Sequence, residues 1–165
     1  MRKIATEKIP QNIADALKEI GENSALFYLF SNVTRHSDWG VYKNFNDSGT
    51  DIVLIRERNN KTKTHVQKIK IEVKTRQRLE TTSEKDNSAQ FTLTENEWKQ
   101  SDFVIGIWLE HNFIFVIPVD KLSPTKNNGK TVYKFTATLT RATNELTPNS
   151  KQYLQNWKII KTKMK

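Results

Sequence analysis

The sequence predicts an α/β fold in which an N-terminal helix precedes a β-meander and a mixed central sheet of four or five strands, flanked by helices. Three observations support this fold class: helical spacing of apolar residues near the N-terminus, strict alternation in a later segment, and two strongly apolar runs separated by a turn. The 165 residues suit one domain. We assign residues 1–157 to that domain and expect a basic, frayed tail at residues 158–165.

The first helix is predicted between Asn12 and Phe30. Asn12 is a suitable capping residue, and Gly21 interrupts the pattern, which indicates either a bend or two shorter helices. The apolar residues that recur at the spacing of one helical face are Ile13, Leu17, Ile20, Phe27 and Phe30.

An antiparallel meander is predicted to follow the helix. Its three strands are expected at Asp38–Phe45, Thr50–Arg58 and His65–Arg76, separated by polar turns. In the third strand the apolar residues Ile69, Ile71 and Val73 alternate with Lys70, Glu72 and Lys74. One face of this strand is therefore apolar and the other is charged.

The second half of the chain combines a polar loop with buried strands. Thr94 and Glu97 have the spacing of a capping box that opens a short helix. Near-continuous hydrophobicity predicts a hairpin that is buried on both faces. The predicted segments are a mobile loop at Arg78–Ser88, the hairpin strands Phe103–Leu109 and Phe113–Val119, a further strand at Thr131–Leu139, and a last helix from Thr147.

Composition and charge favour some classes of function and exclude others. The chain has 27 Lys and Arg against 18 Asp and Glu, a formal charge of +9, which favours a polyanionic partner such as nucleic acid. The absence of cysteine excludes disulfides, thiolate metal sites and cysteine nucleophiles. We find no membrane-spanning run, no secretory signal and no phosphate-binding glycine loop, and expect a cytoplasmic protein that is neither an NTPase nor dinucleotide-dependent.

Two strand motifs point to a catalytic site. If the second and third strands form a hairpin, Asp51 at the start of one lies near Glu72 at the end of the other, and Lys74 projects on the same side as Glu72. Two close carboxylates call for a cation, and oxygen ligands select a hard ion, Mg²⁺ or Mn²⁺. Such an ion activates water and neutralises charge on a phosphodiester. Lys74 can orient that water or stabilise the pentavalent phosphorus, and Gly49 suits a turn with positive φ.

These residues, NDSGTDIVLI followed by KIKIEVKTR, resemble the Asp…Glu-x-Lys core of the PD-(D/E)XK, restriction-endonuclease-like nuclease superfamily, and in particular its Mrr-like and Holliday-junction-resolvase-like members. The resemblance extends from about Leu17 to Leu109 in its order of elements. Thr50 stands where the family name has proline, and Gln90 leads into Phe91 rather than into the Gln-x-x-x-Tyr of the exonuclease branch.

The resemblance implies a divalent metal held by Asp51, Glu72 and the Val73 carbonyl, with Lys74 positioning the attacking water and Glu22 assisting the metal. Glu19 is the second candidate for that helix carboxylate. Lys68, Arg76 and Arg78 are candidates for contacts with phosphates near the site, and are equally consistent with solvated charges.

Three functions are consistent with the sequence. The first is a Mg²⁺- or Mn²⁺-dependent DNA endonuclease that leaves a 5′-phosphate and acts as a homodimer if both strands are cut. The second is a catalytically inactive, basic nucleic-acid-binding module. The third is a structural or protein-interaction domain, in which Lys70, Glu72 and Lys74 only form the solvent-exposed face of a sheet.

Overall fold

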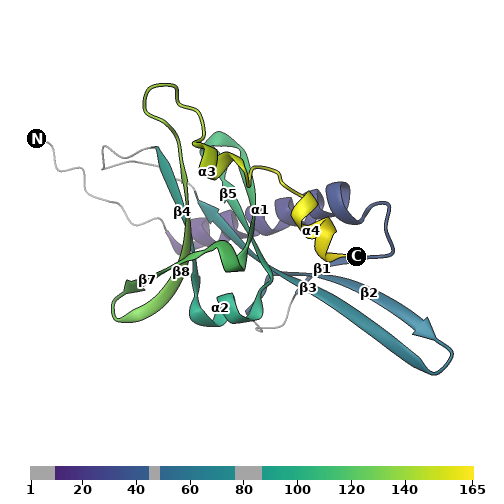
Figure 1. Ribbon diagram of the computed structural model, residues 1–165. Helices are drawn as coiled ribbons and strands as arrows, with labels where there is room; N and C mark the ends of the chain where they lie inside the picture. The colour runs from purple at the N-terminus through teal and green to yellow at the C-terminus, as the bar shows by residue number, and fades with distance from the viewer. Residues whose placement is uncertain (1–9, 45–48, 77–86) are drawn as a thin grey trace, which may run out of the picture.

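The N-terminal helix is continuous and leads into the predicted meander. Figure 1 shows the computed structural model, which describes residues 10–44, 49–76 and 87–165. Helix α1 covers Gln11–Leu29 and continues into a π-helical turn at Phe30–Thr34. Pro10, not Asn12, occupies the capping position, and the helix runs through Gly21 as one element rather than as two shorter helices.

Five strands form the main sheet in the order β1-β2-β3-β5-β6. The first three are antiparallel neighbours, as predicted, and β5 then pairs with β3 in parallel before turning back into β6. The parallel pairing makes the sheet mixed and places β5, every residue of which is buried, inside it. The strands are β1 Gly40–Lys43, β2 Ile52–Asn60, β3 Lys63–Arg76, β5 Phe103–Trp108 and β6 Phe113–Pro118.

A second sheet has the order β4-β8-β7. Of its three strands, the sequence predicted only β8, as the segment Thr131–Leu139. This sheet packs on one face of the main sheet through a cluster that includes Phe91 and Phe115. Gly106 allows this contact, because a Cβ there would lie 2.8 Å from the Phe91 ring. Its strands are β4 Ser88–Thr94, β7 Ser123–Asn127 and β8 Lys130–Thr138, and α2, Glu95–Gln100, follows β4.

The other face of the main sheet is covered by α1 and the C-terminal helix. Here α1 buries Gly21, Glu22, Ala25 and Leu29. The apolar face expected from the spacing lies elsewhere on the helix and is largely in solvent: Ile13, Ile20, Phe27 and Phe30 are each at least two-fifths exposed. Small residues at positions 21 and 25 bring the backbone close to the sheet, so the buried stripe is narrower than the apolar one.

The last residues are ordered into a helix, whereas a frayed tail was expected. Helix α4 covers Lys158–Lys163, and both Ile160 and Met164 are buried in the core on the α1 side of the main sheet. The positive charges that suggested fraying lie on its outer side, while its apolar residues face the sheet. A short helix, α3 Pro148–Lys151, precedes it, and three-residue 3₁₀ turns occur at Leu109–His111 and Val119–Lys121.

The tryptophans are structural, as their size suggested. Trp39, Trp108 and Trp157 are buried, and Trp98 stacks on Tyr133 with ring centroids 4.2 Å apart. None of the helices in the described parts of the chain is long and apolar enough to cross a membrane.

Candidate functional site

The site begins where β2 begins. Strand β2 starts at Ile52, opposite Ile71, whereas β3 continues to Arg76. The last residues of β3 therefore have no neighbouring strand on the β2 side, which leaves an open edge there. Asp51 lies at that edge: its backbone N–H donates to the Ile71 carbonyl at 3.1 Å. Its carboxylate Oδ2 accepts the Val73 N–H at 2.8 Å. The Asp51 side chain thereby occupies the place of a missing strand neighbour.

Gly49 sets the path of the chain into Asp51. Its φ is +80°, the left-handed region that glycine adopts readily, as the motif predicted. A Cβ at this position would also lie 2.6 Å from Gln100 Oε1 of α2. The turn that delivers Asp51 to β3 therefore packs tightly against α2.

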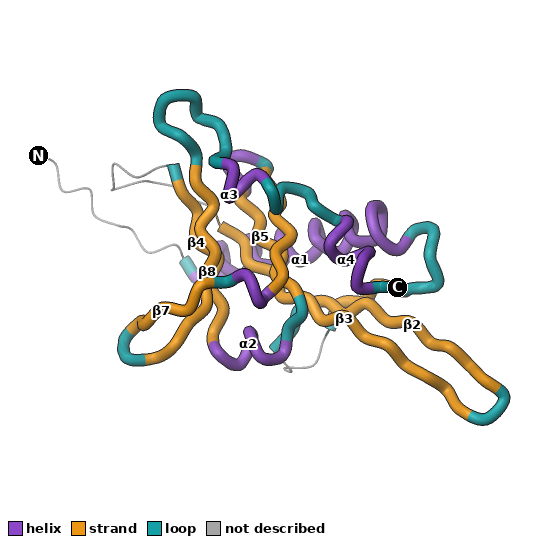
Figure 2. Tube along the Cα trace, in the orientation of Figure 1, coloured by secondary structure: helices purple, strands orange, loops and turns teal. Residues whose placement is uncertain are grey.

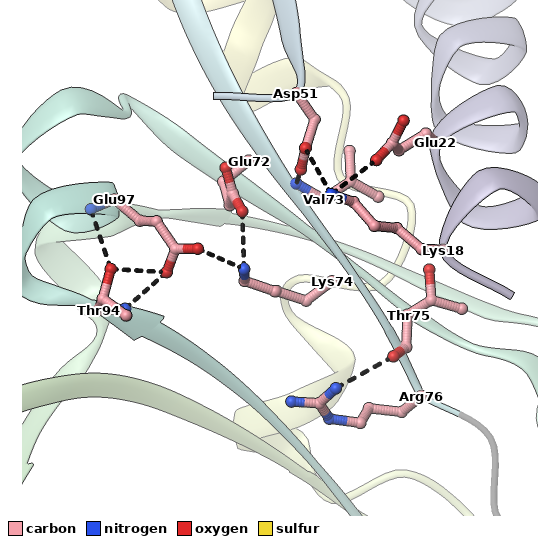
Figure 3. Close-up of polar contacts among 10 residues, drawn as sticks. All are labelled: Lys18, Glu22, Asp51, Glu72, Val73, Lys74, Thr75, Arg76, Thr94 and Glu97. Carbon is pink, nitrogen blue, oxygen red and sulfur yellow. Dashed lines mark hydrogen bonds and ion pairs between the residues drawn. The ribbon is translucent and has the colours of Figure 1, made fainter. Parts of the chain in front are cut away.

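Glu72 and Lys74 project side by side from β3, as alternation along a strand requires. Figure 3 shows Lys74 Nζ pointing between two carboxylates: it lies 2.7 Å from Glu72 Oε1 and 2.8 Å from Glu97 Oε1. The side chain of Glu72 is only 6% exposed and that of Lys74 is 20% exposed. Lys74 thus donates to both carboxyl groups in a largely desolvated setting.

Glu97 is a site residue that sequence reasoning missed. The capping box was recognised, and the structure confirms it: Glu97 Oε2 accepts the Thr94 N–H at 2.7 Å, and the Thr94 side chain accepts the Glu97 N–H. Its other oxygen binds Lys74. The local motif located the residue, but only the pairing of distant strands brings the start of α2 to the end of β3.

The helix carboxylate at the site is Glu22, because Glu19 is exposed on α1 while Glu22 is buried. Lys43 Nζ lies 2.9 Å from Glu22 Oε2, and Lys18 Nζ lies 3.5 Å from its Oε1 and 4.0 Å from Asp51 Oδ1. Gly21 permits this approach, since a Cβ there would lie 1.7 Å from Thr75 Oγ1 of β3.

Burial dominates the ionisation of the two strand carboxylates. Burial, aided by the nearby Asp51 charge and opposed by Lys74, raises the pKa of Glu72 to about 8. Burial also raises the pKa of Asp51, despite the Val73 N–H that favours its charged form, and Glu22 adds to the rise. Two buried carboxyl groups that repel each other in this way lack a sufficient counter-charge.

Lys74 and Glu97, by contrast, have pKa shifts that favour their charged forms. Burial favours the neutral form of Lys74, but the charge of Glu72 and the hydrogen bonds to both carboxylates outweigh it and raise the Lys74 pKa. Burial likewise disfavours charged Glu97, but hydrogen bonds from Lys74 and the Thr94 N–H lower its pKa. Lys74 is therefore an ammonium at neutral pH and a hydrogen-bond donor rather than a base.

A pocket of about 380 Å³ opens in front of these groups. Arg76 lies at its rim, where its guanidinium donates to the carbonyls of Gln90 and Thr75 at 2.6 and 3.2 Å. The pocket is lined by Ala14, Leu17 and Lys18 of α1, by residues 72–76 of β3, and by Glu97. Its mixture of cationic and carboxyl side chains could accommodate a phosphate group next to Glu72.

The donor set fits a hard divalent ion at Asp51 and Glu72, but not a cage made only of side chains. Within residues 10–44, 49–76 and 87–165, no three Asp, Glu or His side chains stand close enough together to hold a metal ion. Glu22 has both oxygens engaged by lysines. Mg²⁺ is often bound by one or two carboxylates, with water and substrate phosphate completing the shell, and Asp51 and Glu72 match that pattern.

The other residues considered from the sequence lie outside the pocket or outside the described part of the chain. Lys68 is exposed on β3, two residues beyond Lys70 and outside the pocket. Arg78, and most of the loop expected at Arg78–Ser88, lie outside the described residues. The histidines expected to be non-catalytic, His36, His65 and His111, take no part in the pocket in front of Glu72.

Comparison with known proteins bears on the fold alone. No protein-family model matches the chain, and no curated protein matches it. Among solved structures, it is similar to a bacterial homing endonuclease, I-Ssp6803I, with a TM-score of 0.54 and 19% sequence identity over 91% of this chain and 94% of that one. The chain thus shares its fold with that structure over nearly its whole length.

Proposed function

We propose that the protein is a metal-dependent DNA endonuclease of the PD-(D/E)XK type. The observation that carries the proposal is the group of Asp51, buried Glu72 and half-buried Lys74 at the open edge of β3, with a pocket in front of it. A fold shared with a homing endonuclease and a charge of +9 support DNA as the substrate.

In this proposal Asp51, Glu72 and the Val73 carbonyl hold Mg²⁺ or Mn²⁺, with Glu22 at the edge of the shell. The ion, when bound, lowers the pKa of a coordinated water and offsets charge on the scissile phosphate. Glu72 gives up the proton that its raised pKa retains in the absence of the ion.

The protonated Lys74 has a different task. As a hydrogen-bond donor fixed by Glu72 and Glu97, it orients the attacking water and stabilises negative charge as the phosphorus becomes pentavalent. Arg76 at the pocket rim is placed to contact a neighbouring phosphate. The product would carry a 5′-phosphate.

Incubation of supercoiled plasmid with Mg²⁺ tests the proposal directly. The wild-type protein should nick or linearise the plasmid, whereas Asp51→Ala and Lys74→Ala should not, and Lys99→Ala on the exposed side of α2 should behave as wild type. Equal nicking by all four proteins, or none by the wild type on linear, branched and supercoiled DNA, would contradict it.

A catalytically inactive nucleic-acid-binding module is the second candidate. The observation that favours it is that Lys74 and two lysines near Glu22 already occupy carboxylate oxygens that a metal would use. This candidate predicts salt-sensitive DNA binding that Mg²⁺ does not change and no cleavage.

Cutting both strands of a duplex requires two active sites, and we propose a homodimer for that reaction. Sedimentation of the protein with and without a short duplex measures this. A two-to-one complex of protein and DNA is expected, and a one-to-one complex that still linearises plasmid in a single encounter would contradict it.

A further inference from the structure

The distal part of the β2–β3 hairpin leaves the body of the molecule. Strand β1 pairs with β2 only as far as Ile55, and β5 pairs with β3 only from Ile71 onward. Residues 56–60 therefore pair only with residues 63–67, and Figures 1 and 2 show them projecting from the sheet as a two-stranded arm. Residues 68–70, at the base of the arm, pair with residues 53–55 of β2. We call residues 56–70 the ribbon. From Glu57 to Lys68 every residue of the ribbon is exposed.

The base of the ribbon is fixed to the body. Arg56 is only 5% exposed, although it is charged. Its Nε donates to Gln67 Oε1 across the strands at 2.8 Å, its guanidinium lies 4.8 Å from the Trp39 ring centre, and its Nη1 is 3.5 Å from Asp38 Oδ1. An isolated two-stranded hairpin is only marginally stable in water, so this anchor holds the arm in one direction.

The ribbon is basic both in the projecting arm and at its base. Between Glu57 and Lys70 it carries five cationic side chains and one acidic one, so 5 − 1 = +4 with His65 neutral. Arg58 lies 3.8 Å from Asp38. The four lysines, Lys61, Lys63, Lys68 and Lys70, form no ion pair with any residue that the structure describes. Nearly half of the net charge of the chain is thus on the projecting arm and its base.

Two of these lysines lie on the same face as the candidate site. Side chains two apart on a strand share a face, so Lys68 and Lys70 follow Glu72 and Lys74 on one side of β3. A DNA backbone lying across the pocket would therefore meet cations in line with β3. The tip at Thr62 is ten residues from Glu72, which at the rise of a strand is about 33 Å.

We infer that the ribbon is a DNA-binding arm that enters the major groove of a duplex about one helical turn from the phosphodiester to be cut. A two-stranded ribbon fits the major groove, its lysines match the charge of the flanking phosphates, and its length matches the repeat of roughly 34 Å in B-DNA. The inference rests on the proposed action on DNA and adds which segment holds the duplex and where.

Lysines on open strand edges also have a simpler role, because they discourage edge-to-edge association. The two roles differ in their consequences. If the lysines only protect the edges, their removal promotes self-association and leaves DNA affinity as it is. If the ribbon binds DNA, their removal weakens binding and reduces its salt dependence.

The test compares two triple variants with the same change of charge. Lys61→Gln, Lys63→Gln and Lys68→Gln remove three charges from the ribbon, and Lys126→Gln, Lys130→Gln and Lys151→Gln remove three exposed charges elsewhere. Binding of each protein to a labelled 30-base-pair duplex is measured by anisotropy in EDTA at several salt concentrations. Monomer content is checked by sedimentation.

The ribbon variant should bind at least tenfold more weakly than wild type, with a slope of log K against log salt that is smaller by about 2 to 3. The control variant should stay within about threefold of wild type. Dimethyl sulfate footprinting of guanine N7 should show major-groove protection by wild type that the ribbon variant loses. Equal losses in both variants, unchanged affinity of the ribbon variant, or no binding by wild type would overturn the inference.

Cleavage, measured separately with Mg²⁺, distinguishes this result from failure of the proposed function. A protein that cuts DNA but binds it without the ribbon keeps the proposed function and refutes the arm. A protein that binds through the ribbon and never cuts keeps the arm and refutes the endonuclease.

Discussion

The ammonium of Lys74 lies 2.8 Å from the Glu97 carboxylate, and this contact joins the end of β3 to the start of α2. Glu97 is itself held by the Thr94 cap, so the helix terminus fixes the orientation of a lysine on the sheet. Lys74 needs such support because alternation along β3 sets its direction but not its rotamer. Glu97 is thus a positioning residue for the proposed catalytic lysine.

Glu97→Gln separates this positioning from the helix cap. Glutamine also serves at the third position of a capping box, so α2 should persist while the negative partner of Lys74 is lost. We expect kcat for plasmid nicking to fall by about 10- to 100-fold, the usual effect of losing an outer hydrogen-bond partner. DNA affinity in EDTA should not change. Glu95→Gln, which removes an exposed partner of Lys99, is the matched control.

A decrease in kcat of the same size in Glu95→Gln, or a loss of α2 signals from the NMR spectrum of Glu97→Gln, would refute the positioning role.

The raised pKa of Glu72 predicts a pH dependence of stability without metal. Its pKa rises from 4.5 in an exposed chain to about 8 in the fold, so the folded protein retains a proton that the unfolded chain releases. This contribution is complete below about pH 4.5 and is lost as the pH rises through about 8. In EDTA, the Tm of wild type should therefore fall relative to that of Glu72→Gln between pH 5 and pH 8.5.

A difference in Tm between the two proteins that stays constant across this range would show that the Glu72 carboxyl titrates normally.

Divalent ions should reverse that loss of stability. At pH 8, an ion present at ten times its Kd stabilises the fold by about 1.4 kcal/mol, which for a chain of this size raises Tm by about 3–5 °C. Asp51→Asn should abolish the shift produced by Mn²⁺, because it removes one of the two available carboxylates. Asp120→Asn, an exposed substitution of the same kind, should retain it. An equal shift in both variants would place the ion elsewhere.

Gly21→Ala tests the contact between α1 and β3 that brings Glu22 to the site. Alanine favours a helix over glycine by about 1 kcal/mol, yet its Cβ would overlap Thr75 Oγ1. Overpacking of this kind costs about 1–3 kcal/mol, so we expect denaturant unfolding to show a net destabilisation. Thr75→Ala in the same chain should recover much of it. A stabilised Gly21→Ala protein would show that the helix does not pack this closely.

Several features of the fold were predictable from local pattern. Alternation in β3 separated the buried Ile71 from the charged Glu72 and Lys74, and the capping box gave the start of α2. The near-continuous apolar run of β5 correctly indicated a strand buried on both faces. These features depend on residues close in sequence, which is why the pattern reveals them.

Other features depend on contacts between distant segments. The apolar spacing on α1 predicted a face but not which face the sheet covers, and small residues at Gly21 and Ala25 decided that. The approach of Glu97 to Lys74 depends on the parallel pairing of β3 with β5, to which no local signal points. Likewise the C-terminal residues are ordered because Ile160 and Met164 pack into the core. The basic residues around them predicted a frayed tail instead.

A crystal structure with Mn²⁺ at pH 8 tests directly whether the carboxylates of Asp51 and Glu72 share one cation beside Lys74. We expect an anomalous peak within about 2.2 Å of an oxygen of Asp51 and an oxygen of Glu72, the distance typical of a small hard cation. A peak bound at other residues, or none at either carboxylate when both side chains are ordered at millimolar Mn²⁺, would contradict it.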